Sequence, residues 1–209
     1  RVPPSSTELV ARSAPPSPGE SEGSFVPIAT KEQATELLAG LAVDDGSSAP
    51  SYSRDAFGGW LDEDGDCLDT RAEVLAVESL VAVGGKCTVT SGRWESPYDG
   101  TVLLTPDGVD IDHVVALANA WESGAWRWND DRRAAFANDL THPEHLVAVS
   151  ASINRAKGAR SPDEWMIPSR SRGTRCAYLV NWVVIKARWG LSITSSELDT
   201  LQRGIRSQC

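Results

Sequence analysis

The stretch DIDHVVALANAW, residues 110–121, decides the fold expected for this chain. Acidic and apolar residues alternate up to His113, which predicts a strand, and the residues after it have helical spacing. The chain has only three histidines; His142 and His145 flank a turn and are predicted as surface or strand-start residues. His113 is either a buried side chain with one backbone hydrogen bond or a general base beside a metal.

Predicted helices alternate with short predicted strands along the chain, which indicates an α+β class. TVLL (101–104) and VDIDHVV (109–115) are predicted to form a β-hairpin across the turn TPDG. HLVAVS, 145–150, is predicted as a further strand, followed by a helix that begins with SINRAKGAR. The other expected elements are a strand at 86–94 and helices at 31–43, 71–80, 116–126, 132–140, 174–190 and 195–209.

Composition divides the chain into a tail and one domain. Residues 1–25 are rich in Pro, Ser, Gly and Glu, so they are expected to be a disordered tail or linker. Residues 26–209 suffice for a single packed domain. No apolar run approaches the length of roughly 20 residues that a membrane-spanning helix needs. The chain opens on Arg1 without a signal peptide, which suggests a mature or trimmed form of something longer.

The four cysteines fall as two well-separated pairs and lack the spacing of a zinc site. Three disulfide pairings are possible, and the local one, Cys67 with Cys87 and Cys176 with Cys209, is favoured. Paired cysteines indicate an oxidising compartment, so we expect a secreted, extracellular protein. We also expect a monomer that does not associate with a membrane.

The net charge of −9, from 29 acidic and 20 basic residues, opposes non-specific binding to nucleic acid. Basic residues nevertheless gather in one segment, whose only acidic residues are Asp163 and Glu164. This cluster is either a solvated face or a phosphate-binding surface. Its members are Arg155, Lys157, Arg160, Arg170, Arg172 and Arg175.

The central third of the chain resembles the HNH, or ββα-metal, nuclease motif. The resemblance is carried by DIDHVVAL (110–117) and FANDLTHPEHLVAVSASINRAKGARSPDEW (136–165), together with the flanking DTRAEVL (69–75) and SGRWESPYDG (91–100). The clear match covers about residues 110–168, and looser similarity extends from about residue 52 to the C-terminus. In these details the chain is similar to a secreted bacterial branch of HNH endonucleases. The resemblance implies a ββα-metal core at about 109–160, embedded among helices and stapled by disulfides.

The resemblance also implies a role for each residue of the site. His113 would be the general base that activates water, and Asn138 would stiffen the loop beside it. Asp112 and Asn154 would offer oxygen ligands to Mg²⁺ or Mn²⁺, with Asp110 as a reserve ligand. Because neighbouring strand residues point to opposite faces, Asp112 and His113 can share a site only where the strand ends.

The substrate expected from the resemblance is DNA, with RNA as an alternative, cleaved with little sequence preference to 5′-phosphate and 3′-hydroxyl ends. Lys157, with Arg155 or Arg160, is expected to meet phosphates, and Arg71 is a further candidate for the same site. The tryptophans nearest to the expected site are either core residues or part of a substrate groove. They are Trp121, Trp126 and Trp128.

A second candidate metal site lies in DEDGDCLDTRAE, residues 62–73. Asp62, Asp64, Asp66 and Glu73 occupy positions 1, 3, 5 and 12 of a calcium loop of the EF-hand kind. Position 6, where that pattern has glycine for a sharp turn, is Cys67. The stretch is therefore either an acidic surface loop or a Ca²⁺ site. In the second case, the alternative function is a non-catalytic, calcium-binding extracellular module.

Overall fold

The computed structural model describes residues 25–46, 48–169 and 171–209. In these ranges, helices surround two antiparallel sheets of two strands each, which fits the predicted α+β class. In chain order the elements are α1 (Lys31–Gly40), η1 (Arg54–Phe57), α2 (Thr70–Glu78), β1 (Trp94–Glu95), β2 (Val102–Leu103), η2 (Pro106–Gly108), β3 (Val109–His113), α3 (Leu117–Glu122), η3 (Ala125–Arg127), α4 (Asp130–Ala137), β4 (Leu146–Ser150), α5 (Ala151–Lys157), α6 (Arg172–Trp189) and α7 (Ser195–Gln208).

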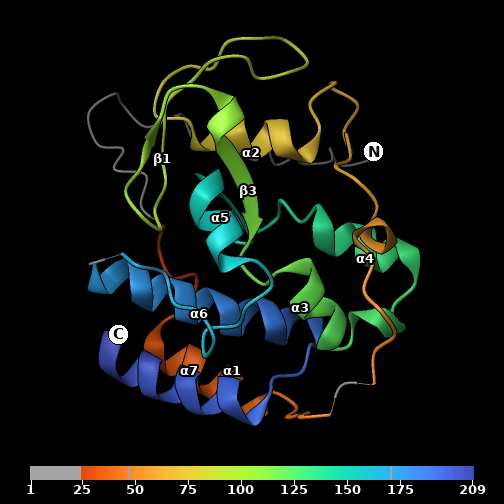
Figure 1. Cartoon of the computed structure of the whole chain (residues 1–209), viewed down its shortest axis with the longest axis vertical. Coiled ribbons are helices and arrows are strands. Elements are labelled where there is room, and N and C mark those ends of the chain that lie inside the picture. Colours follow the sequence, from red (N-terminus) through yellow and green to blue (C-terminus); the bar gives the residue numbers. More distant parts are fainter. Residues whose placement is uncertain (1–24, 47, 170) are drawn as a thin grey trace, which may run out of the picture.

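Strands β3 and β4 and helix α5 form a strand–strand–helix unit near the centre of Figure 1. β3 pairs antiparallel with β4, so that His113 lies opposite Leu146. β4 runs directly into α5 because the side chain of Ser150 accepts a hydrogen bond from the N–H of Ile153 and caps the helix. The helix then returns along the strands, and its last residue, Lys157, reaches the end of β3.

This unit separates two apolar clusters, because alternate residues of a strand face opposite sides. Val109 and Ile111 of β3 pack with residues of α2 and with Trp94 of β1. On the other side, Val147 and Val149 of β4 join a larger cluster that includes the buried face of α6. The end of β3 is therefore fixed from both sides.

Helices α1, α6 and α7 form the lower part of the molecule as it is drawn in Figure 1. α1 and α7 each begin with a capping box, at Thr30 and Thr194, which satisfies two backbone donors at each helix start. The disulfide Cys176–Cys209 joins the first turns of α6 to the residue after α7. Among the described residues, no helix has the length and apolar character needed to cross a membrane.

Both predicted disulfide pairings are confirmed, but the predicted hairpin is wrong. β2 pairs with β1, with Leu103 opposite Trp94, while β3 pairs with β4. The turn TPDG forms η2, which turns the chain from one sheet into the other. Residues 86–91 also do not form the predicted strand, because this segment is bent around the disulfide from Cys87 to Cys67.

The predicted tail, residues 1–25, lies outside the described residues except for Phe25, whose ring packs edge-on against Tyr98. The helix predicted at 31–43 ends at Gly40. The helix predicted at 71–80 and the strand predicted at 145–150 are confirmed to within a few residues. The larger errors are the strand pairing of the hairpin and the strand predicted at 86–94, of which only Trp94 lies in a strand.

Candidate active site

A pocket of about 320 Å³ lies at the C-terminal end of β3. Asp112 and His113 belong to opposite faces of the sheet, yet both border this pocket because it lies where the strand ends. A single site for both side chains requires this arrangement. Three segments contribute the polar lining: Tyr52 and Arg54 around the start of η1, Asp112 and His113 of β3, and Asn154 and Arg155 of α5.

His113 is held in one orientation by its ring nitrogen Nε2, which lies 2.9 Å from the carbonyl oxygen of Ala137. A carbonyl oxygen only accepts hydrogen bonds, so Nε2 carries the proton and Nδ1 keeps a free lone pair. The indole of Trp60 lies parallel to the imidazole, with ring centroids 5.3 Å apart. Because the residue is only 5% exposed, it offers one unprotonated nitrogen in a fixed position.

Burial lowers the pKa of His113 to about 3. The neighbouring His145 and the charges of Arg54 and Lys157 act in the same direction, and the hydrogen bond to Ala137 opposes them. The imidazole is therefore neutral near pH 7, which is the form that accepts a proton. His145 directly precedes β4, in agreement with the predicted strand start, but it is not a surface residue: it is fully buried beside His113, and burial lowers its pKa to about 4.

Asp112 is buried and bonded through both carboxylate oxygens. Its Oδ1 lies 2.8 Å from Nζ of Lys157, and its Oδ2 accepts a hydrogen bond of 2.9 Å from the hydroxyl of Tyr98. Lys157 also donates to the backbone carbonyl of His113 at 2.7 Å and is 0% exposed. The prediction that Lys157 meets phosphate is therefore wrong, because its ammonium group is enclosed by the protein and paired with Asp112.

Asn154 is oriented by Asp110, the predicted reserve ligand. The side-chain nitrogen of Asn154 donates to Oδ2 of Asp110 at 3.1 Å. An ionised carboxylate only accepts hydrogen bonds, so the amide must turn its nitrogen toward Asp110 and its oxygen away from it. Asp110 does not line the pocket, whereas Asn154 does. The structure thus brings Asp110 and Asn154 together as an orienting pair.

Oxygen donors for a hard divalent cation are present in this pocket. Asp112 and Asn154 both border it, and each carboxylate oxygen has a second lone pair beyond the one used by Lys157 or Tyr98. Mg²⁺ usually binds one or two protein carboxylates and completes its shell with water and phosphate oxygens. Asp112 and Asn154 therefore fit such an ion.

Asn138 connects the two sides of the histidine. Its side-chain oxygen accepts from the N–H of Leu61 at 3.0 Å, and its side-chain nitrogen donates to the carbonyl of Gly59 at 3.2 Å. These two residues flank Trp60, the residue stacked on His113, while the residue before Asn138 supplies the carbonyl that binds Nε2. Asn138 touches none of the pocket-lining groups, so its contribution is to fix both neighbours of the imidazole.

The predicted basic surface is dispersed in the structure. Arg155 lines the pocket, whereas the side chain of Arg160, three residues beyond the end of α5, donates to the carbonyl of Lys157. Arg172 and Arg175 bind Gln208, and Arg170 lies outside the described residues. Of the two alternatives for this cluster, a single phosphate-binding face is not formed by the described residues, because Lys157 is buried, Arg160 donates to a backbone carbonyl, and Arg172 and Arg175 bind Gln208.

Arg71 and the three nearby tryptophans also lie away from the pocket. Arg71 donates to the carbonyls of Pro106 and Val109 at the beginning of β3, the end opposite to His113. It braces the strand and does not approach the site as predicted. The tryptophans are core residues and none of them lines the pocket: they are Trp121, Trp126 and Trp128.

Residues 77–203 match the family model described as GmrSD restriction endonucleases, C-terminal domain. The chain belongs to this family. The matched segment contains β3, β4 and α5, and with them His113, Asn138 and Asn154. Membership of the GmrSD C-terminal domain family agrees with a nuclease and with nucleic acid as the partner.

An "Uncharacterized secreted protein" of Arthroderma benhamiae is 43% identical to the chain over 175 residues, which are 83% of this chain and 84% of the relative. The predicted extracellular localisation is confirmed by this similarity. The relative is fungal, so it gives no support to the bacterial branch suggested by the sequence. No solved structure matches the chain.

Three residues of the site precede the segment that matches the GmrSD C-terminal domain model: Tyr52, Arg54 and Trp60. Sequence patterns gave no sign of them, because they approach His113 only through the tertiary fold. Tyr98, which binds Asp112, lies within the matched segment but far along the chain from its partner.

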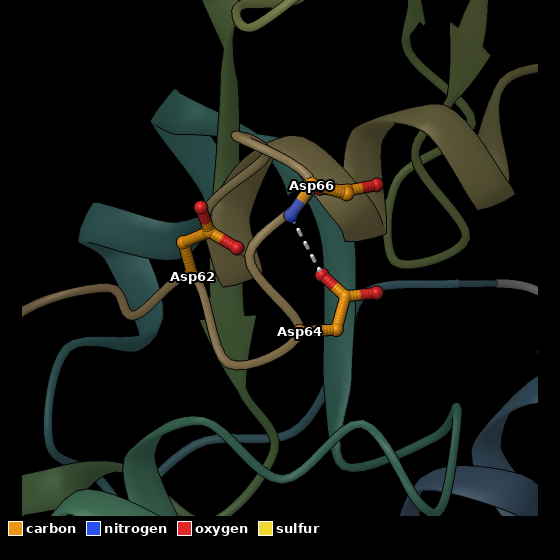
Figure 2. Close-up of side chains that lie close together, drawn as sticks. All are labelled: Asp62, Asp64 and Asp66. Carbon is orange, nitrogen blue, oxygen red and sulfur yellow. Dashed lines mark hydrogen bonds between the residues drawn. The ribbon is translucent and has the colours of Figure 1, made fainter.

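The acidic loop also precedes the matched segment. Carboxylate oxygens of Asp62, Asp64 and Asp66 all lie within 4.8 Å of one another, and Figure 2 shows Asp64 bonded to the N–H of Asp66. Cys67 has φ +78°, so the cysteine adopts the left-handed conformation for which calcium loops use glycine. Burial and then the charges of these aspartates raise the pKa of Glu73.

Proposed function

We propose that the chain is a secreted, metal-dependent endonuclease of the HNH type, which hydrolyses phosphodiester bonds of DNA, with RNA as an alternative substrate. One observation carries the proposal. His113, whose Nε2 is bound to Ala137 and whose Nδ1 keeps its lone pair, lines the same pocket as the oxygen-bearing residues Asp112 and Asn154. A base and two ligands for a hard cation are the groups that hydrolysis of a phosphodiester requires.

The chemistry assigned to the chain's own residues centres on one proton. Nδ1 of His113 accepts a proton from a water molecule as the water oxygen bonds to phosphorus and the bond to the 3′ oxygen breaks. The imidazolium that results still donates from Nε2 to Ala137, so the ring does not have to turn during the reaction. Lys157 holds the backbone of His113 and the carboxylate of Asp112 in register. The products carry 5′-phosphate and 3′-hydroxyl ends.

The cation belongs between Asp112 and Asn154 in this proposal, with Mg²⁺ or Mn²⁺ as the ions that suit oxygen ligands. When bound, it supplies positive charge that stabilises the phosphate oxygens and the departing oxygen. Because both ligands are oxygen donors, zinc and nickel, which favour imidazole, suit this pair less well.

The test is cleavage of plasmid DNA, a single-stranded oligodeoxynucleotide and total RNA by the folded, disulfide-bonded protein with Mg²⁺, with EDTA and with the His113→Ala variant. We expect cleavage that requires both the metal and His113, while circular dichroism shows an unchanged fold for the variant. A variant that keeps most of the activity would remove His113 from the mechanism. No cleavage with Mg²⁺, Mn²⁺ or Ca²⁺ would favour the alternative, a non-catalytic extracellular module.

We propose Ca²⁺ as the ion of the second candidate site, with a structural role. Support comes from the conformation of Cys67 at the sixth position and from α2, which begins at Thr70 as the helix that follows a calcium loop would. Asp62, Asp64, Asp66 and Glu73 would hold the ion. Thermal unfolding with Ca²⁺ and with EDTA tests this: we expect a higher Tm with Ca²⁺, and no such shift in Asp62→Asn. An equal shift in that variant would contradict it.

A further inference from the structure

The segment 50–57 contributes part of the lining of the pocket at the end of β3 and has no assigned role. Tyr52 and Arg54 of this segment border the same pocket as His113 and Arg155. The segment is rigidly attached to the core: the indole nitrogen of Trp121 donates to the carbonyl of Pro50 at 2.7 Å, and Arg133 donates to the carbonyl of Ala56 at 2.8 Å. Side chains of this segment are therefore presented from a fixed backbone.

The segment 50–57 and helix α5 each contribute one arginine without an anionic partner to the pocket. Arg54 and Arg155 are exposed, and neither forms a hydrogen bond or an ion pair with any of the residues that the structure describes. Other arginines around the core, such as Arg71 and Arg133, donate to backbone carbonyls. In a chain of net charge −9, two free guanidinium groups that flank one recess make a local site for phosphate oxygens.

Tyr52 adds an aromatic surface at the rim of this recess. Its ring is packed edge-on against Trp121, at a centroid distance of 6.2 Å, and tilted against Phe57, at 6.3 Å. Tyr52 nevertheless remains 36% exposed. A ring fixed on one side and open on the other can stack with a nucleic-acid base, and such stacking requires that the base is not paired within a duplex.

We propose that Arg54 and Arg155 bind consecutive phosphates on either side of the pocket, that Tyr52 stacks on an adjacent base, and that the substrate is an unpaired strand. The recessed position of His113 and Asp112 supports this choice, because a flexible single strand can bend into a pocket more easily than a duplex can. The proposal rests on the proposed function, whose site it extends to the segment before α2.

Binding is measured separately from cleavage, in the His113→Ala background, by fluorescence anisotropy of a labelled single-stranded oligodeoxynucleotide and of the same sequence as a duplex. We expect the single strand to bind more tightly. Arg54→Ala should weaken its binding and lower the slope of log K against log salt by about 0.7, the value for one phosphate contact in a single strand. Arg203→Ala, on the exposed face of α7, is the matched control and should leave the slope unchanged.

Tyr52→Leu tests the stacking while it keeps an apolar side chain against Trp121 and Phe57. We expect roughly tenfold weaker binding of the single strand, little change for the duplex, and recovery in Tyr52→Phe. Equal binding of strand and duplex, or Arg54 and Tyr52 variants that bind like the parent, would overturn the inference.

The two proposals fail in different ways. Metal-dependent cleavage that is insensitive to substitution of Tyr52 and Arg54 would support the proposed nuclease function and refute the proposed binding of a single strand by these residues. Selective binding of the single strand without any cleavage by the parent protein would support the proposed binding surface and refute the nuclease function.

Discussion

The side-chain nitrogen of Asn154 lies 3.1 Å from a carboxylate oxygen of Asp110, and this contact sets which atom of the amide is left for the pocket. Two acidic residues two positions apart in β3 thus have different tasks. Asp112 borders the pocket, and Asp110 orients the residue that does so from the neighbouring helix. Hydrogen-bonding partners of metal ligands commonly have this orienting task.

Asp110→Ala is expected to raise the Mg²⁺ concentration needed for half-maximal cleavage by about tenfold to a hundredfold, the usual effect of removing a partner of a metal ligand. Asp110→Asn keeps an oxygen that can accept from Asn154, so its effect should be smaller. Titration of cleavage against Mg²⁺ measures both variants. Equal defects in the two would show that the charge of Asp110 matters and not its orienting bond.

Lys157→Met tests whether the charge of Lys157 stabilises the folded protein or only binds phosphate. Removing the ammonium group leaves Asp112 buried without its partner, which for a buried ion pair costs about 3–5 kcal/mol in the free energy of unfolding. Arg155→Met on the same helix removes an exposed charge and should change that free energy by less than about 0.5 kcal/mol. Denaturant unfolding of the two variants gives the comparison. A Lys157 variant as stable as the Arg155 variant would contradict the pairing.

Asn138→Ala is expected to lower both stability and activity. The substitution removes the hydrogen bonds to the N–H of Leu61 and to the carbonyl of Gly59, each worth about 0.5–1.5 kcal/mol because both residues are exposed to water, and it releases Trp60 from its place on His113. Trp60→Leu is the matched variant, because it removes the stacked ring but keeps the hydrogen bonds of Asn138. Trp60→Leu should reduce kcat with a smaller loss of stability, and unchanged kcat would exclude a positioning role for the ring.

The pH dependence of stability should contain two opposed contributions. Burial raises the pKa of Glu78 to about 8, although the N–H of Ala148 donates to its carboxylate. Folded protein holds this proton where the unfolded chain has lost it, so Glu78 lowers stability as pH rises from about 4.5 to 8. Glu78→Gln keeps an acceptor for Ala148 and should raise the free energy of unfolding at pH 8 by on the order of 1–2 kcal/mol.

In the Glu78→Gln protein, the contribution of the two histidines is measured without the opposing contribution of Glu78. His113 and His145 have pKa values lowered to about 3 and 4. Below pH 6.5 the two histidines are therefore protonated in the unfolded chain but stay neutral in the folded protein. Stability present above pH 6.5 is therefore lost as pH falls, by about 2 kcal/mol for each histidine at pH 5. Denaturant unfolding between pH 8 and 5 should show this decline, and a flat profile would contradict the burial of both rings.

The sequence allowed prediction of elements and of residues close together in the chain, but not of long-range partners. The strand that ends at His113 and the helix that carries Asn154 follow from local periodicity. The partner of β3 does not, because β2 and β4 are both short and apolar and either could have paired with it. Pairing with β4 is what brings α5 against the end of β3.

The site shows the same division. Residue types and order identify His113 and Asn138, whereas nothing local indicates that Trp60 stacks on the histidine or that Arg54 and Arg155 border the same pocket. Lys157 is instructive, because a lysine near an expected phosphate site is ordinarily a phosphate ligand. Only its burial beside Asp112 shows that its charge is used inside the protein.

The disulfide between Cys67 and Cys87 encloses all of α2 within one covalent loop. A single proteolytic cut anywhere between these cysteines, such as in the exposed stretch around Val81, would leave both fragments attached to each other. The helix and its contacts with β4 would therefore stay in place after nicking. Such a molecule would migrate as one band on a non-reducing gel and as two after reduction. Outside the cell, a protease that cuts within this loop would therefore not separate the fragments.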